Sequence, residues 1–211
     1  MKTRTGIVLA AGAAARLPNK ALLPIAGDRI CIESALGWLA RQERVSKIVV
    51  VVNTSGIVPA VLDMRGWRGR LEYVVQPRML GVVDAIARCA PLVKDDAVVT
   101  FCDNVYDGMD APGVVPPPLA SVIQGTKVED QLDWYDPSSS QWRLRGGHET
   151  PQWYFAGWMV VPRAVAELGM PHQALVKFMN EHGFVPLRRE RGSWTDIGTP
   201  TSYRRYLDDQ S

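Results

Sequence analysis

The chain has 211 residues, of which 46% are hydrophobic and 22% are charged; this is the composition of a globular protein and excludes disordered and collagen-like classes. The length fits a single domain, residues 1–211. The formal net charge of +2 excludes duplex nucleic acid as the expected partner, and no stretch reaches the roughly 18 apolar residues that a membrane-spanning helix needs.

Short aliphatic runs alternate with helical patterns in the first half of the chain. Runs so uniformly apolar are typical of strands buried on both faces of a sheet. They cover residues 6–10, 47–53, 71–76 and 97–103. Segments of helical length lie between them, at residues 30–42, 56–67 and 80–93. This alternation predicts a three-layer, doubly wound, Rossmann-like α/β fold around a mixed, mainly parallel sheet.

The pattern changes after Asp103. The Pro- and Gly-rich segment 104–118 predicts a loop. Aromatic, β-prone runs then predict strands that extend the sheet in an antiparallel or mixed arrangement. They cover residues 119–124, 131–136, 141–145 and 153–161. The closing segments predict helices near residues 162–168 and 172–182, a short strand near 184–188 and a last helix from about residue 200.

Polar or glycine residues stand at the carboxyl ends of the first four predicted strands, where parallel α/β sheets bind their ligands. These ends are Ala11–Gly12, Asn53, Gln76 and Asp103. The turn at Gly12 lets backbone N–H groups approach a phosphate closely, although small residues also permit tight packing of a helix on the sheet.

Two cations and two acids complete a candidate constellation. Arg16 and Lys20 are four residues apart, so on a helical turn they would face the same way, and otherwise they would still lie close together. Two such cations beside a glycine turn suit a triphosphate with pyrophosphate as leaving group. Asp103 ends a buried strand, which is a usual place for a magnesium ligand when phosphates are present. Asp196 precedes a glycine turn and a helix. Loop charges for the cations, and turn or cap roles for the acids, are the alternatives.

A secretion signal is the competing explanation of the amino terminus, because Lys2 and Arg4 precede the apolar residues 6–15. Cleavage would remove the first strand of the repeating pattern, so we expect this segment to belong to the fold. The cysteines form no CxxC pair and predict buried free thiols in a reducing, cytoplasmic compartment. They are Cys31, Cys89 and Cys102.

Four motifs, taken in order, resemble the nucleotidyltransferases that make nucleotide sugars. They are "LAAGxxxRLxxKxLLPIAG", "QPxxxGxxDAI", "FCDN" and "WTDIGT", and the resemblance runs from Gly6 to about Tyr206. It implies the nucleotide-diphospho-sugar transferase fold and Mg²⁺-dependent transfer of a nucleotidyl group from an NTP to a sugar 1-phosphate. It also implies a nucleotide-binding half, residues 1–103, and an acceptor-binding half, residues 104–211.

The resemblance carries roles onto individual residues. Arg16 would hold the β- and γ-phosphates, and Lys20 would bridge the triphosphate and the incoming phosphate. Asp103 and Asp196 match the acids that hold the catalytic Mg²⁺. Gln76 matches the residue that hydrogen-bonds the nucleobase. The residues expected around the nucleotide are Leu9, Ala11, Gly12, Gln76, Gly81 and Asp103.

The acceptor half departs from the family pattern. The chain has "QLDWYD" and "LRGGHE" where a "GxVE" segment and an "EKP" lysine are typical. Arg143, Arg145 or His148 is the expected replacement for that lysine at the acceptor phosphate. Later tryptophans, Trp194 among them, are expected to pack in the core or on a dimer surface rather than to stack on a sugar. Relatives often pair, so a homodimer is one arrangement that the resemblance allows.

Three rivals remain open. The short spacing between Arg16 and Lys20 favours a non-sugar acceptor, such as an alditol, choline or isoprenoid-precursor phosphate. A glycosyltransferase of similar fold would want a DxD motif, but Asn104 and Val105 follow Asp103. A non-catalytic nucleotide-binding protein would have no need of both the cations and the acids.

Overall fold

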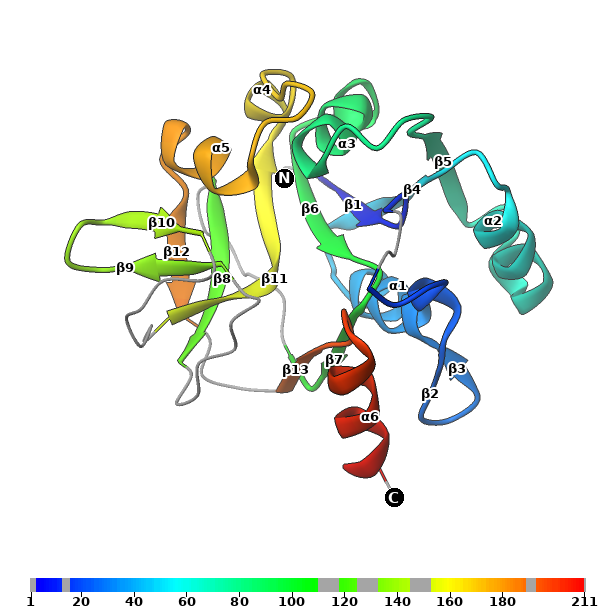
Figure 1. The fold of residues 1–211 in the computed structure, drawn as a ribbon. Helices are drawn as coiled ribbons and strands as arrows, with labels where there is room; N and C mark the ends of the chain where they lie inside the picture. Colours follow the sequence, from blue (N-terminus) through cyan, green and yellow to red (C-terminus); the bar gives the residue numbers. More distant parts are fainter. Residues whose placement is uncertain are drawn as a thin grey trace.

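The computed structural model describes residues 3–12, 16–109, 118–124, 133–144, 153–188 and 193–210. Within this part of the chain, nine strands form one mixed sheet. Helices cover it on both sides, and the last helix, α6 (Pro200–Asp208), lies beyond the ends of the central strands (Figure 1).

The parallel part of the sheet comes from the predicted aliphatic runs. Its strands lie in the order β6 (Asp96–Phe101), β1 (Arg4–Leu9), β4 (Val45–Val52) and β5 (Leu71–Val75). Each neighbouring pair is parallel, with Ile7 of β1 opposite Val49 on one side and Val99 on the other. The predicted parallel sheet is therefore confirmed, but burial on both faces holds for β1, β4 and β6 and not for β5, which lies at the edge of the sheet and is only partly buried.

An antiparallel strand joins this part to the second half of the chain. The strand β11 (Trp153–Pro162) pairs with β6 and with β8 (Leu119–Gln124). The remaining strands extend the sheet beyond β11 and β8. They are β9 (Trp134–Asp136), β10 (Gln141–Arg143) and β12 (Val185–Arg188), the last of them parallel to β8. The predicted mixed sheet is confirmed.

Alternate residues of each central strand face two separate cores. In β1, Ile7 and Leu9 pack with residues of the helices on one face, and Val8 packs with those on the other. The first face carries α3 (Val82–Cys89), α4 (Arg163–Ala166) and α5 (Leu175–Glu181). The second carries α1 (Cys31–Ala40) and α2 (Ile57–Leu62). This burial of both faces explains why the strands read as continuous apolar runs.

Several boundaries differ from the prediction. The second helix ends at Leu62 and not at residue 67, because a π-helical turn over Asp63–Trp67 contains Gly66 with φ of +86°. The prediction of a loop over residues 104–118 is wrong for its first four residues. They form the strand β7 (Asn104–Asp107), which pairs with β13 (Ser193–Asp196) in a separate antiparallel ribbon. Residues 110–117 lie outside the described residues. A short hairpin, β2 (Pro24–Ile25) with β3 (Arg29–Ile30), was also not predicted.

The cysteines behave as expected: all three are free and buried. None of the helices in the described ranges is long and apolar enough to cross a membrane.

Candidate functional site

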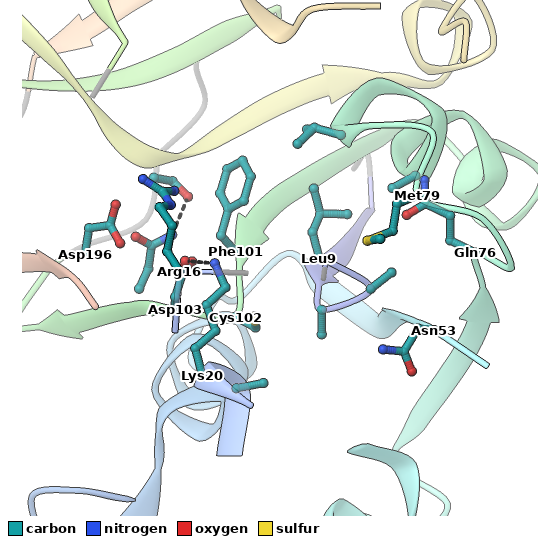
Figure 2. A pocket seen from close by; sticks show the side chains of 18 of the residues that line it. Leu9, Arg16, Lys20, Asn53, Gln76, Met79, Phe101, Cys102, Asp103 and Asp196 are labelled. Carbon is teal, nitrogen blue, oxygen red and sulfur yellow. Dashed lines mark hydrogen bonds and ion pairs between the residues drawn. The ribbon is translucent and has the colours of Figure 1, made fainter. Parts of the chain in front are cut away.

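A cavity of about 630 Å³ lies at the carboxyl ends of the four parallel strands. Its wall contains every described residue that the sequence placed near the nucleotide or the metal: Leu9, Ala11, Gly12, Arg16, Lys20, Gln76, Gly81, Asp103 and Asp196. Figure 2 shows Arg16, Lys20 and the two acids at one end, Gln76 with Asn53 and Met79 at the other, and Leu9 between them. Residues from the beginning, the middle and the end of the chain thus line one cavity at the carboxyl ends of the strands.

The cationic end of the cavity is organised by an ion pair between Lys20 and Asp103. Burial alone would lower the pKa of Lys20, but the neighbouring Asp103 charge and hydrogen bond outweigh it and the pKa is raised. Arg16 and Lys20 do not share a helical turn, which was one of the two arrangements that their spacing allowed. Asn19 has a left-handed φ of +54°, and a 3₁₀ helix, Lys20–Leu22, begins after it. Both cations still line the cavity.

The β7–β13 ribbon brings the two acids together. Asn104, directly after Asp103, is paired with Asp196 in the strand register. The Ile197 N–H also donates to the Asp103 carbonyl oxygen over 2.8 Å. Two segments about 90 residues apart are thereby held with their carboxylates at one end of the cavity (Figure 2).

The Asp196 carboxylate is buried and only partly compensated. Burial, reinforced by the charge of Asp103, raises the pKa of Asp196 to about 6, although Lys20, a hydrogen bond from the Gly198 backbone and Arg16 oppose that rise. The Oδ1 atom is buried and has no hydrogen-bond partner among the described residues. A carboxylate oxygen in this condition is expected to have an external partner, because an unpaired buried charge is expensive.

These features fit a divalent cation whose coordination a phosphate completes. Mg²⁺ prefers oxygen ligands and is usually bound by one or two carboxylates together with substrate phosphates and water. Asp103 and Asp196 supply such oxygens, and the described residues hold no cluster of three or more His, Cys, Asp or Glu that would form a closed protein site. The pair would therefore hold Mg²⁺ only in company with a ligand such as a nucleotide.

A side-chain clamp that the sequence did not reveal holds the ribbon against the sheet. The Trp194 indole N–H donates to Asn104 Oδ1 over 2.8 Å, and Asn104 Nδ2 donates to the Gly157 carbonyl oxygen over 3.3 Å. Gly157 has φ of +73°, and a Cβ there would lie 2.6 Å from Trp194 Nε1. Trp194 therefore packs against the core as expected and also lines the cavity. The available signal was Gly157, a lone glycine within an apolar strand pattern.

The opposite end of the cavity is built around Gln76, the residue after β5. Its backbone N–H donates to the Val52 carbonyl oxygen over 2.8 Å and so continues the strand pairing. Its side chain is buried and donates from Nε2 to the Gly81 carbonyl oxygen, 3.0 Å away. Gly81 has φ of +96°, which explains the glycine at the start of α3. The two residues expected near a base are thus in direct contact.

The expected acceptor residues are less well placed. Arg143 lies in the β9–β10 hairpin, where Nη2 donates to Asp136 and Ser139, and it is not among the described residues that line the cavity. Arg145 and His148 lie outside the described residues. The wall on that side is mainly apolar and includes Phe101, Leu144, Phe155 and Leu175.

The one cysteine in the described part of the cavity wall, Cys102, is a poor candidate for a nucleophile. Cys102 lines the cavity, but burial raises the pKa of its thiol to about 12. The thiol is therefore protonated near neutral pH and reacts poorly, since the thiolate is the nucleophilic form.

The chain matches no protein-family model. Its structure is similar to that of HddC from Yersinia pseudotuberculosis, with a TM-score of 0.76 and 13% identity over 99% of this chain and 100% of HddC. It is also similar to the CTP:phosphocholine cytidylyltransferase LicC from Streptococcus pneumoniae, with a TM-score of 0.76, 13% identity and complete coverage of both chains.

A third similar structure is the inositol-1-phosphate CTP transferase from T. maritima, with a TM-score of 0.74 and 14% identity over 98% of this chain and 95% of that one. HddC has also been solved in complex with GMP-PN, and that structure matches with a TM-score of 0.77 and 14% identity over 99% of this chain and 100% of HddC. The chain thus has the α/β fold of these proteins, two of which are named as a CTP transferase and a cytidylyltransferase, and this is the fold that the resemblance in its sequence predicted.

Proposed function

We propose that this protein is a Mg²⁺-dependent nucleotidyltransferase that joins an NMP unit from an NTP to a sugar 1-phosphate and releases pyrophosphate. The observation that carries the proposal is that the two ends of one cavity carry different side chains. Two cations and two carboxylates lie at one end, and a buried amide, Gln76, lies at the other. This arrangement suits a triphosphate at the charged end and its base at the amide end.

The reaction needs positioning and charge neutralisation but no covalent enzyme intermediate. An oxygen of the acceptor phosphate attacks the α-phosphorus of the NTP and forms a new P–O bond. The bond from the α-phosphorus to the oxygen bridging the β-phosphate breaks, and its electron pair leaves with pyrophosphate. Arg16 and Lys20 would neutralise charge on the triphosphate as it separates. Mg²⁺ held by Asp103 and Asp196 would further neutralise the phosphate charge.

The sugar 1-phosphate is the acceptor implied by the sequence motifs, including "WTDIGT". A non-sugar phosphate is the second candidate, and one observation favours it: two of the similar structures are named for phosphocholine and inositol-1-phosphate. We also expect the protein to work in a reducing cytoplasm, because its three cysteines are buried free thiols.

The test is a panel of NTPs against sugar 1-phosphates, phosphocholine and alditol phosphates, read by pyrophosphate release with and without Mg²⁺. We expect release only when an NTP, a phosphorylated acceptor and Mg²⁺ are all present. Asp196→Asn should remove most of the activity while the protein stays folded. Release from no NTP–acceptor pair would contradict the transfer reaction, and release with non-sugar acceptors alone would replace the sugar proposal by its rival.

A further inference from the structure

A third, smaller core adjoins the charged end of the cavity and is separate from the two cores that cover the sheet. Leu17 and Tyr203 are partly buried and pack against it. None of its side chains is among those that line the cavity. Its buried members, which we call the α6 core, come from the β2–β3 hairpin, the start of α1, the segments of β7 and β13, and α6: Ile25, Cys31, Val105, Ile197 and Tyr206.

Both acidic segments of the site are anchored in the α6 core by a nearby apolar side chain. Asp196 lines the cavity, and the next residue, Ile197, is fully buried in the core. Asp103 also lines the cavity, and Val105 packs in the core two residues later. In each segment, the packed side chain fixes the backbone from which the carboxylate extends.

The segment that carries Arg16 is attached to the same core by Leu17. Arg16 and Pro18 line the cavity, whereas Leu17 between them packs against the α6 core. A proline ring fixes its own φ and restricts the backbone of the residue before it, which here is Leu17. Once the Leu17 side chain is packed, few backbone arrangements therefore remain for the adjacent Arg16.

The helix α6 links this core to both of its neighbours in the site. It begins four residues after Asp196. The Tyr206 hydroxyl oxygen accepts from the Ala26 N–H over 3.2 Å. The Tyr203 hydroxyl donates to the Pro24 carbonyl oxygen over 2.8 Å. The hairpin that follows the Arg16 segment in sequence is thus bonded to the helix that follows the second acid.

We propose that Leu17 is a positioning residue for the triphosphate: by packing against the α6 core, it holds Arg16 in place relative to Asp103 and Asp196. The inference rests on the proposed function in one respect, since the β- and γ-phosphates of an NTP are taken to lie at the charged end of the cavity. Leu17 has no need to touch the nucleotide, because it acts through the backbone that it shares with Arg16.

The consequence for binding depends on the length of the phosphate chain. If Arg16 is loosely held, a ligand that it contacts has to order it on binding. Fixing the backbone of one residue costs enough entropy to weaken binding about tenfold. A nucleoside monophosphate has no β- or γ-phosphate, so its affinity should not depend on Leu17.

The experiment measures binding by calorimetry, with Mg²⁺ and without acceptor. The ligands are whichever of CTP, GTP, ATP, UTP and dTTP binds the wild type most tightly, and its own monophosphate. Leu17→Ala, Arg16→Met and the variant with both changes form a double-mutant cycle, which isolates the coupling between the two residues. Leu17→Met keeps an apolar side chain of similar volume that can still pack. Leu71→Ala is the matched control, because Leu71 is a half-buried leucine at the start of β5 that packs against the α1-side core and does not line the cavity.

We expect Leu17→Ala to weaken the triphosphate about tenfold and the monophosphate less than about twofold. Leu17→Met and Leu71→Ala should bind both nucleotides as the wild type does. In the Arg16→Met background, Leu17→Ala should have little further effect, because no guanidinium is left to position. Unchanged triphosphate binding in Leu17→Ala, equal weakening of both nucleotides, or the same loss in the Arg16→Met background would each overturn the inference.

Failure of the proposed function gives a different result. If the selective loss is observed but no phosphorylated acceptor yields pyrophosphate, the transfer reaction is wrong and the role of Leu17 stands. If the wild type binds none of the five triphosphates, both are wrong.

Discussion

The indole N–H of Trp194 donates to the side-chain oxygen of Asn104 over 2.8 Å, and this bond ties the strand that ends in Asp196 to the strand that follows Asp103. Asn104 in turn donates to the Gly157 carbonyl oxygen in β11. The relative position of the Asp103 and Asp196 carboxylates therefore depends on hydrogen bonds that neither carboxylate makes itself. A site that neutralises phosphate charge requires such fixed geometry, because small misplacements weaken the transition-state interactions.

Trp194→Phe should lower kcat while leaving most of the stability intact. The phenyl ring keeps part of the apolar contact but loses the bond to Asn104, so the Asp103–Asp196 geometry loosens; we expect a loss of about tenfold in kcat. The measurement is steady-state pyrophosphate release at saturating Mg²⁺. The matched control is Trp142→Phe, which removes an indole bond of 2.9 Å to the Phe184 carbonyl oxygen outside the cavity wall. Equal kcat values in the two variants would contradict a positioning role for Trp194.

Asp196→Asn should stabilise the Mg²⁺-free protein at pH 8 while it removes activity. Burial and Asp103 raise the folded-state pKa of Asp196 from 3.8 to about 6. A carboxyl with a raised pKa destabilises the fold when it is ionised: the penalty is absent below about pH 4 and grows as pH rises through the folded-state pKa. The penalty in the wild type at pH 8 is of order 2 kcal/mol.

The check on Asp196 is thermal unfolding of both proteins in EDTA at pH 8 and pH 4.5. The variant should melt several degrees higher than the wild type at pH 8, and this advantage should shrink at pH 4.5. Mg²⁺ with nucleotide should raise the melting temperature of the wild type more than that of the variant. A variant that is less stable than the wild type at pH 8 would contradict the assignment of an unsatisfied carboxylate.

The sequence was informative where burial on two faces dictates the pattern. Ile7 and Val8 pack into opposite cores, so the middle of β1 has to be apolar on both faces, and the same holds for residues 48–52 of β4 and residues 97–99 of β6. The carboxyl ends of the predicted strands then located most of the cavity, including Gln76 and Asp103. The position of the site therefore follows from the local pattern and one topological rule, whereas the order of the strands comes from the structure alone.

The same reasoning failed where a contact joins distant segments. The strand β7 is only four residues long and pairs with β13 about 90 residues later, so neither segment carries a recognisable pattern by itself. The four-residue spacing of Arg16 and Lys20 left open whether they share a helical turn; Asn19 between them has a left-handed φ of +54°, and both cations line the cavity. Trp194 packs against the core as expected, but the sequence pattern does not show that its indole N–H also has a polar partner.

Lys20→Met should reduce kcat by about 10²-fold or more, because the variant loses a fixed charge at the triphosphate. The substitution also leaves two neighbouring carboxylates, Asp103 and Asp196, without the Lys20 cation. We therefore expect a lower melting temperature at pH 8, which Mg²⁺ should partly restore. The control is Lys47→Met, which breaks a half-exposed pair with Glu72, with Nζ and Oε1 3.4 Å apart. Pyrophosphate release and thermal unfolding are measured on both. Activity in Lys20→Met within threefold of the control would dismiss Lys20 as a phosphate-binding cation.

Gly157→Ala should be among the most damaging single-methyl changes in the protein. The added Cβ would sit 2.6 Å from Trp194 Nε1 and 2.7 Å from two atoms of the Asn104 side chain. Its φ of +73° is also unfavourable for alanine. Gly183→Ala separates these effects, because Gly183 has φ of +63° but a Cβ there meets nothing within 4 Å.

Backbone strain alone should destabilise Gly183→Ala by about 1 kcal/mol. Overpacking adds about 1–3 kcal/mol more in Gly157→Ala. The free energies of unfolding come from urea titrations of the two variants and the wild type. Gly157→Ala should also lose Mg²⁺-dependent activity, because relief of the clash requires the Trp194–Asn104 clamp to move, whereas Gly183→Ala should retain it. Equal losses of stability in the two variants, with activity preserved in both, would contradict the role of the Trp194–Asn104 clamp. The ribbon backbone alone would then position Asp103 and Asp196.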